Sequence, residues 1–241
     1  MSPPIVEIRR NAARRDRKCD WARPTLSVAI PFLRDDPRAL IAELVKQAEA
    51  ASHGIEIILI DDGAPDRALT DAVWRQIDAA RRPATLVVSR RNLGRSAARN
   101  RLAAEAIGEW VLFLDADMRV APDFLQRWLA LLDRARFDAA FGGFELSNED
   151  AARHPVHAAL THAGDIAAAC DRALTGATAV CASNLAARRA FLARTRFDEA
   201  YVGWGWEDVD WAVRAARAGT LVHVENPARH GGLEDVDALI A

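Results

Sequence analysis

The sequence predicts an α/β fold in which a mostly parallel central sheet is covered by helices on both faces. Two observations lead to this prediction. Between residues 25 and 117, short apolar runs alternate with segments whose apolar residues recur at helical spacing. The runs are almost continuously apolar, which is typical of strands buried on both faces. With 241 residues, the chain is long enough for one domain with a large core.

The expected elements follow in chain order. Strands are predicted at residues 26–30, 55–60, 85–88 and 110–114, with helices between them at 37–51, 66–80 and 95–107. After residue 117 the alternation loosens. There we expect helices at 122–134 and 205–218, and strands at 139–146, 183–188 and 220–224. The Ala-rich stretch at 149–175 contains His154, His157 and His162, which we interpret as solvated surface.

Residues 1–24 are distinct in composition, with seven basic side chains against three acidic ones and little apolar periodicity. One interpretation is a solvated tail or a short helix packed on the outside. The alternative is a basic patch that contacts anionic lipid headgroups or a partner. We therefore separate a basic extension, 1–24, from a single domain, 25–241.

Overall composition excludes several classes of protein. The 32 basic and 34 acidic residues give a net charge of −2, which does not indicate nucleic-acid binding. The three cysteines are far apart and form no CxxC pair, so neither a disulfide framework nor a structural zinc site is expected. No apolar run approaches the ~18 residues of a transmembrane helix, and no secretory signal is present. These observations predict a cytoplasmic protein, with peripheral membrane contact through residues 1–24 as the alternative.

Carboxylates follow two of the predicted strands. Asp61 and Asp62 come after the second strand, and Asp115-Ala116-Asp117 comes after the fourth. Each motif has an alternative interpretation, because Asp-Asp-Gly is a common turn and Asp-x-Asp can precede a helix start at Pro122. Ligands of open α/β sheets, however, bind beyond the carboxyl ends of the strands. Hard oxygen ligands at that edge suit Mg²⁺ or Mn²⁺, which would also hold phosphate oxygens.

Two further segments carry candidate site residues. In S-R-R-N-L-G-R-S-A-A-R-N, Gly94 permits a turn before a helix whose N-terminus can face an anion. Arg99 would point toward the same edge as Asp61 and Asp115. A surface arginine bonded to a helix neighbour is the alternative for this residue.

The segment G-W-G-W-E-D-V-D-W at 203–211 places three tryptophans among acids and glycines, which suits a sugar-binding or hydroxyl-activating site. Glu207 and Asp208 fall at the start of a predicted helix, whose dipole favours the ionised form. Asp208 is thus a candidate general base, although a helix N-cap is the alternative. Asp210 and Arg214 are expected to form a surface ion pair.

Five segments in this order resemble glycosyltransferase family 2, the inverting enzymes of the GT-A fold. They are L-S-V-A-I-P at 26–31, I-I-L-I-D-D-G at 57–63, N-L-G-R-S-A-A-R-N at 92–100, G-E-W-V-L-F-L-D-A-D at 108–117 and F-D-E-A-Y-V-G-W-G-W-E-D-V-D at 197–210. The resemblance covers about residues 26–230. It implies the GT-A (nucleotide-diphospho-sugar transferase) fold, with a nucleotide-binding half, 25–117, and an acceptor and catalytic half, 118–241.

The resemblance also implies roles for individual residues. Asp61 or Asp62, with Arg99, would hold the nucleotide base, usually uracil, in a site that includes Pro31. The motif Asp115-Ala116-Asp117 would bind ribose and the metal.

For the second half, the resemblance implies that Asp208 is the catalytic base. Glu207, with Trp204 or Trp206, would shape the sugar and acceptor site. His230 matches a late metal-ligating histidine, although a histidine near the end of a chain can also be simply exposed.

We therefore expect a metal-dependent inverting glycosyltransferase, a hexosyl- or N-acetylhexosaminyltransferase that uses Mn²⁺ or Mg²⁺ and a UDP-sugar. The acceptor would be a glycan, a lipid-linked molecule or a small molecule. The chain ends soon after His230 and has no Q-x-x-R-W motif, which favours a single transfer over polymerisation. The alternative is a non-catalytic nucleotide-sugar-binding partner protein. A dinucleotide-dependent dehydrogenase is excluded, because no G-x-G-x-x-G follows the first strand.

Overall fold

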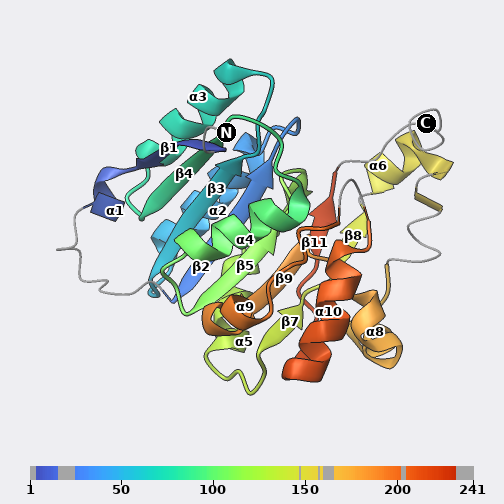
Figure 1. Cartoon of the computed structure of the whole chain (residues 1–241). Coiled ribbons are helices and arrows are strands. Elements are labelled where there is room, and N and C mark those ends of the chain that lie inside the picture. Colours follow the sequence, from blue (N-terminus) through green and yellow to red (C-terminus); the bar gives the residue numbers. More distant parts are fainter. Residues whose placement is uncertain are drawn as a thin grey trace.

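A sheet of eight strands runs through the molecule in the order β1-β4-β3-β2-β5-β9-β7-β10 (Figure 1). The computed structural model describes residues 4–15, 25–146, 148–156, 158–159, 166–201 and 205–231. The strands of this sheet are β1 (Ile5–Arg10), β2 (Leu26–Phe32), β3 (Ile55–Asp61), β4 (Ala84–Ser89), β5 (Trp110–Leu114), β7 (Ala139–Phe141), β9 (Asn184–Arg188) and β10 (Leu221–His223). Strands β5, β2, β3 and β4 are parallel to one another, whereas β1 and β9 run antiparallel to their neighbours.

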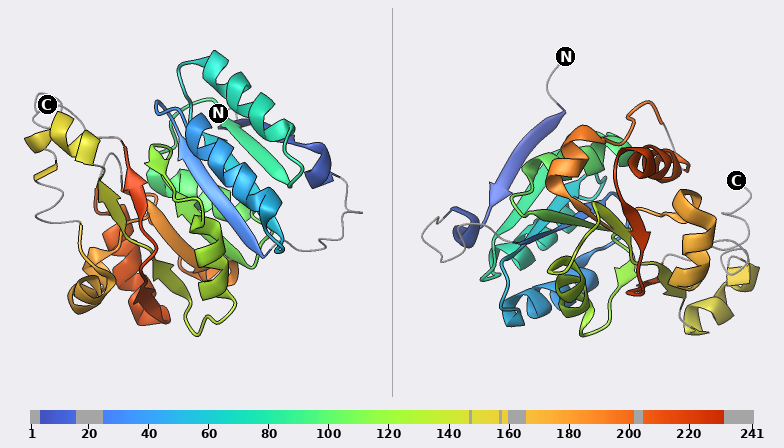
Figure 2. Two further views of the ribbon diagram at one scale, coloured as in Figure 1. Left: turned by 180° about the vertical axis from the view of Figure 1, so that it is seen from behind. Right: turned by 90° about the horizontal axis from the view of Figure 1, so that it is seen from below.

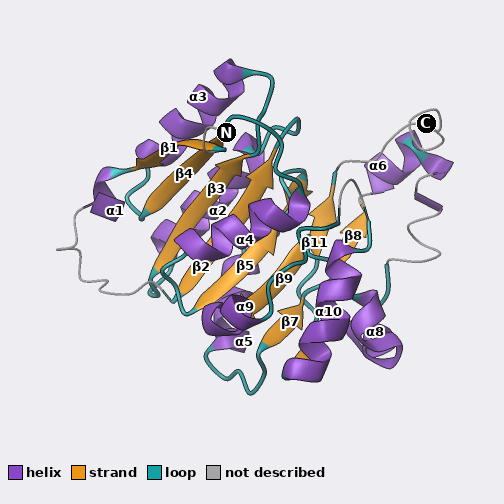
Figure 3. Ribbon diagram, viewed as in Figure 1, coloured by secondary structure: helices purple, strands orange, loops and turns teal. Residues whose placement is uncertain are grey.

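Helices cover both faces of this sheet, as the sequence predicts (Figures 2 and 3). One core lies under α2 (Arg38–Ala50), α3 (Arg67–Asp78) and α5 (Phe124–Leu132). The other lies under α4 (Arg95–Glu105), α9 (Arg189–Arg194) and α10 (Glu207–Ala218). In β2, Val28 faces the first core and Ala29 the second, and both are fully buried. Burial on two faces explains why these strands are apolar runs. The predicted fold class is confirmed.

A second, three-stranded sheet sits beside the carboxyl end of the main one. It consists of β6 (Met118–Arg119), β11 (Ala228–His230) and β8 (Phe144–Leu146). Strand β8 follows β7 directly in the chain but belongs to this second sheet. The prediction of a single strand at 139–146 is therefore wrong. The two strands are separated at Gly143, whose φ of +80° favours glycine. A Cβ at this position would also lie 2.5 Å from the guanidinium of Arg172 in α8 (Ala169–Thr175). After this break, β8 pairs with β11, and β11 pairs with β6, which follows β5 in the chain.

The described part of the basic N-terminal segment, residues 4–15, packs on the main sheet instead of forming a solvated tail. Strand β1 pairs with the edge strand β4, and α1 (Ala12–Arg15) follows it. Asn11 is fully buried, and its amide donates hydrogen bonds to the carbonyls of Ile77, Ala80 and Arg82. Among residues 4–15, the structure thus has the expected short helix together with an edge strand that the sequence analysis did not predict.

Three of the four basic residues that the structure describes in that segment have acidic partners. Arg9 pairs with Asp71, Arg10 with Glu105, and Arg14 with the fully buried Glu56 at 3.3 Å. A buried carboxylate needs such a partner, so these arginines contribute to the fold. Within the described residues, no helix is both long enough and apolar enough to cross a bilayer.

Candidate functional site

The carboxyl ends of β2, β3 and β5 position most of the residues that the sequence singled out. Pro31 lies opposite Ile60 near the end of β2, and Asp61 ends β3. Asp115 follows β5, and Ala116 is buried in the core beside it. The remaining candidates come from α4, from the first turn of α10 and from β11. The structure therefore places these candidate residues at the predicted edge of the sheet.

Arg99 joins two of these groups through its side chain. Its Nη1 donates to Glu207 Oε1 at 3.0 Å, and its Nη2 donates to Asp115 Oδ1 at 3.2 Å. The side chain is only 2% exposed. Arg99 therefore points toward the edge that carries Asp115, as the sequence predicts, and its hydrogen bonds join Asp115 to Glu207. The alternative of a surface arginine is wrong.

Asp61 and Asp62 hold the loops at the end of β3. Asp61 accepts hydrogen bonds from the amide of Ala64 and the hydroxyl of Thr70, each at 2.6 Å, so the turn interpretation describes its contacts. Asp62 accepts from the amides of Leu93 at 2.8 Å and Gly94 at 3.2 Å. Burial raises the pKa of Asp62 to about 6. Asp62 thus connects the β3 end to the start of α4.

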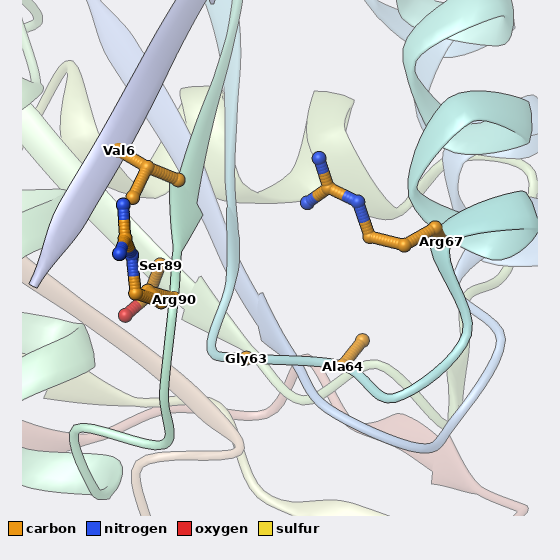
Figure 4. A pocket seen from close by; sticks show the side chains of 6 residues that line it. All are labelled: Val6, Gly63, Ala64, Arg67, Ser89 and Arg90. Carbon is orange, nitrogen blue, oxygen red and sulfur yellow. The ribbon is translucent and has the colours of Figure 1, made fainter.

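A surface hollow of about 370 Å³ is lined in part by Gly63 and Ala64, which follow Asp62 in the chain (Figure 4). Figure 4 shows the guanidinium groups of Arg67 and Arg90 on opposite sides of it. The lining residues are Val6, Gly63, Ala64, Arg67, Ser89 and Arg90. This lining contains none of the residues predicted for the site, so we do not place the donor there.

Asp117 and His230 form the candidate metal pair, with His230 Nε2 at 3.2 Å from Asp117 Oδ2. Strand β11 brings the histidine there, because His230 pairs with Met118 of β6. Burial raises the pKa of Asp117, but the hydrogen bond and charge of His230 outweigh burial and leave that pKa below its usual value. Burial likewise lowers the pKa of His230, and Asp117 more than reverses this effect.

The donor set suits a divalent ion in part. Oδ1 of Asp117 is buried and has no hydrogen-bond partner among the described residues. Within that part of the chain, no three His, Cys, Asp or Glu side chains converge on one metal position. A carboxylate and an imidazole fit Mn²⁺ or Mg²⁺ only if phosphate oxygens or water complete the shell, which is how proteins usually bind Mg²⁺. The residues present therefore fit an ion that arrives with a phosphorylated ligand.

Two groups near these residues, Asp35 and Cys181, were not predicted as site residues. Burial and the charges of Asp117 and Asp115 raise the pKa of Asp35, in the loop after β2. Burial and the carboxylates of Asp208 and Asp115 raise the pKa of the Cys181 thiol, which is hydrogen-bonded to Asp208. Asp35 follows the first strand in Arg34-Asp35-Asp36, and this position was its only detectable signal.

Glu207 and Asp208 occupy the first turn of α10 and have different surroundings. Glu207 is 3% exposed and paired with Arg99. Asp208 is half-buried, and its Oδ2 accepts a hydrogen bond from the amide of Ala182 at 3.2 Å. The N-cap interpretation of Asp208 is wrong, because the N-cap is Trp206. The expected surface pair of Asp210 and Arg214 is present at 2.7 Å.

The tryptophans of this segment separate into different environments. Trp211 is fully buried, and its ring stacks on that of Phe197 with centroids 5.2 Å apart, so it belongs to the core. Trp206 is 73% exposed and has a φ of 69°, a left-handed conformation that is an outlier for a bulky residue. Trp204 lies outside the described residues, as do His157 and His162. Trp206 is therefore an exposed aromatic surface directly before Glu207 and Asp208.

Comparison with known sequences gives a family match over most of the chain. The profile of the family described as glycosyl transferase family 2 matches residues 27–197. An undecaprenyl-phosphate 4-deoxy-4-formamido-L-arabinose transferase of Pseudomonas syringae pv. syringae (strain B728a) is 33% identical over 113 residues. That match covers 45% of this chain and 33% of the relative, so this chain spans about a third of the relative's length.

Solved structures of low sequence identity share the fold. The glucosyl-3-phosphoglycerate synthase of Mycobacterium tuberculosis, solved with Mn²⁺, UDP and phosphoglyceric acid, has a TM-score of 0.60 at 20% identity. The alignment covers 92% of this chain and 75% of the synthase. A mannosyltransferase of Pyrobaculum calidifontis in complex with GDP-Man and Mn²⁺ also gives 0.60 at 20% identity, over 87% of this chain and 57% of the other. These likenesses confirm the predicted GT-A fold.

Proposed function

Because the chain belongs to glycosyl transferase family 2, we propose that it transfers a sugar from a nucleotide sugar to an acceptor hydroxyl with inversion of configuration. One observation carries the proposal. The buried guanidinium of Arg99 binds Asp115, of the D-x-D segment, and Glu207, of the E-D pair. The segment suited to a nucleotide diphosphate and the segment suited to an acceptor thus meet at one site.

The donor would lie along the carboxyl ends of β2, β3 and β5. Its nucleoside would face Pro31, Asp62 and Asp115, and its diphosphate would face Asp117 and His230. A Mn²⁺ or Mg²⁺ ion held by Asp117 and His230 would offset the negative charge of the diphosphate leaving group. The support for UDP is the UDP complex of one structural neighbour, and the GDP-Man complex of the other makes a GDP-sugar the competing donor.

The acceptor would lie on the opposite side of the anomeric carbon, beside Trp206 and Asp208. Asp208 takes the proton of the acceptor hydroxyl as its oxygen attacks the anomeric carbon. The bond from that carbon to the diphosphate oxygen breaks from the opposite face, so the configuration inverts. The product is a glycoside whose sugar is that of the donor, a hexose or an N-acetylhexosamine in our proposal, and the nucleoside diphosphate leaves.

A donor screen tests this proposal. UDP- and GDP-sugars are added to the full chain with and without Mn²⁺, and both melting temperature and nucleoside diphosphate release are measured. We expect one donor to stabilise the protein more when Mn²⁺ is present, and to release its diphosphate when an acceptor is added. Metal-dependent binding without release or transfer would instead favour a non-catalytic nucleotide-sugar-binding protein. Absence of binding by every donor would contradict both functions.

Trp206 offers a test of the acceptor side. In Trp206→Gly and Trp206→Ala the ring is lost. An aromatic contact contributes ~0.5–1.5 kcal/mol, so we expect the acceptor KM to rise about twofold to tenfold. Only glycine adopts the left-handed backbone freely, so the Gly variant should unfold with about 1 kcal/mol more free energy than the Ala variant. Acceptor kinetics and thermal unfolding measure the two effects. Trp206→Phe is the matched control, and an unchanged acceptor KM in both ring-less variants would contradict contact with the acceptor.

A further inference from the structure

Arg99 is buried where α4 meets the two acidic segments of the site. Its guanidinium spans Asp115 and Glu207 with bonds of 3.2 Å and 3.0 Å. We propose that Arg99 is a positioning residue. It holds Asp115, on the donor side, and Glu207, on the acceptor side, at a fixed distance from each other, while Asp117 and Asp208 act on the reactants. This inference rests on the proposed function, and it replaces the expectation that Arg99 holds the nucleotide base.

The neighbours of Arg99 fix its position. Its guanidinium carbon lies 5.7 Å from the centre of the Phe197 ring, which stacks on Trp211 at the other side. The next residue, Asn100, donates a hydrogen bond to the Phe197 carbonyl at 2.9 Å and accepts one from the Phe197 amide at 3.0 Å. Helix α4 is therefore joined to the segment that leads into α10. A guanidinium in this packing has few alternative rotamers, which suits a group that sets the position of others.

The bonding pattern divides the four carboxylates of the site into two classes. Asp115 and Glu207 each give one oxygen to Arg99, and Glu207 is almost completely buried. Asp117 pairs with His230, and Asp208 accepts from the Ala182 amide. A planar fork can bind two carboxylates at once, whereas a lysine ammonium is a point charge on a flexible stem. The geometry thus requires arginine, and it predicts that lysine cannot replace it.

The two roles of Arg99 give different kinetics. A residue that binds the base would, when removed, weaken UDP binding and leave the rate at saturating substrates unchanged. A residue that aligns the donor and acceptor segments would chiefly lower that rate, because a misplacement of about 1 Å can cost about 100-fold. The ratio between the loss of kcat and the loss of UDP affinity therefore separates the two roles.

The test compares Arg99→Lys and Arg99→Met with the native chain. The measurements are kcat at saturating donor and acceptor, the affinity for UDP with Mn²⁺ by calorimetry, and the melting temperature. For Arg99→Lys we expect kcat to fall at least tenfold, and for Arg99→Met about 100-fold, while UDP affinity changes less than about threefold. Arg99→Lys keeps a positive charge at the buried position. If Arg99→Met does not fold, the comparison of Arg99→Lys with the native chain is therefore the test.

Arg101→Met is the matched control, because Arg101 lies on the same helix and pairs with Glu105 away from the site. We expect its kcat to be native. Native kcat in Arg99→Lys, or a loss of UDP affinity as large as the loss of kcat, would overturn the inference while native transfer still supports the proposed function. Absence of transfer by the native chain with every donor would overturn the proposed function itself, and the inference with it.

Discussion

Replacing Asp208 with asparagine should lower transfer about 10²–10⁴-fold, the usual contribution of a general base. Asparagine has the shape of aspartate, and its amide oxygen can still accept the hydrogen bond from Ala182. The variant lacks only the ability to take a proton from the acceptor. Because Asp208 does not face the predicted diphosphate position, the affinity for UDP with Mn²⁺ should stay native. Initial rates at saturating donor and calorimetry with UDP measure the two quantities.

The matched control is Asp210→Asn, two residues further along α10. Asp210 pairs with Arg214 on the surface, where such a pair contributes at most about 1 kcal/mol to stability. Asp210→Asn loses the same charge from the same helix turn, so a native rate in this variant shows that the helix dipole and local charge do not explain the result. If Asp208→Asn keeps more than about a tenth of the native transfer rate, Asp208 is not the general base, because loss of that group should cost at least about 100-fold.

Most of the fold could be predicted because burial on two faces leaves a strong pattern. Strand β3 is buried at every position, and its sequence is correspondingly a run of isoleucine and leucine, interrupted by Glu56 and ended by Asp61. Strand β1 could not be predicted, since an edge strand with one covered face resembles an exposed basic segment. The break at Gly143 also escaped prediction. It depends on the guanidinium of Arg172, which is distant in sequence.

For the site, the sequence predicts which residues lie at one edge of the sheet, but not which of them contact one another. Asp115 and Glu207 do approach each other, but their shared partner is set by the packing of α4 against Phe197. Spacing along the chain carries no information on such tertiary contacts. In the same way, the sequence of Asp61 and Asp62 could not tell that their oxygens bind loop groups. Local patterns thus locate functional segments, whereas partner choice needs the three-dimensional arrangement.

Asp117→Asn should remove most of the effect of Mn²⁺ on nucleotide binding. Loss of a group that only supports a metal ligand typically costs 10–100-fold in metal affinity, so loss of a direct ligand should cost at least about that much. Asparagine keeps an oxygen near His230 but loses the negative charge that a divalent cation requires. The affinity for UDP should therefore fall at least about tenfold with Mn²⁺ and change little in the presence of a chelator. Calorimetry under both conditions measures this difference.

The comparison with Asp115→Asn sharpens the assignment. One oxygen of Asp115 is engaged by Arg99, whereas Asp117 has a buried oxygen without a hydrogen-bond partner among the described residues. Asp115→Asn should therefore weaken UDP binding with and without Mn²⁺, while the effect of Asp117→Asn should depend on the metal. Asp123→Asn is the control, since Asp123 pairs with Arg127 on the surface. Equal metal dependence in the two D-x-D variants would show that both aspartates hold the ion, and a native response in Asp117→Asn would exclude Asp117 as its ligand.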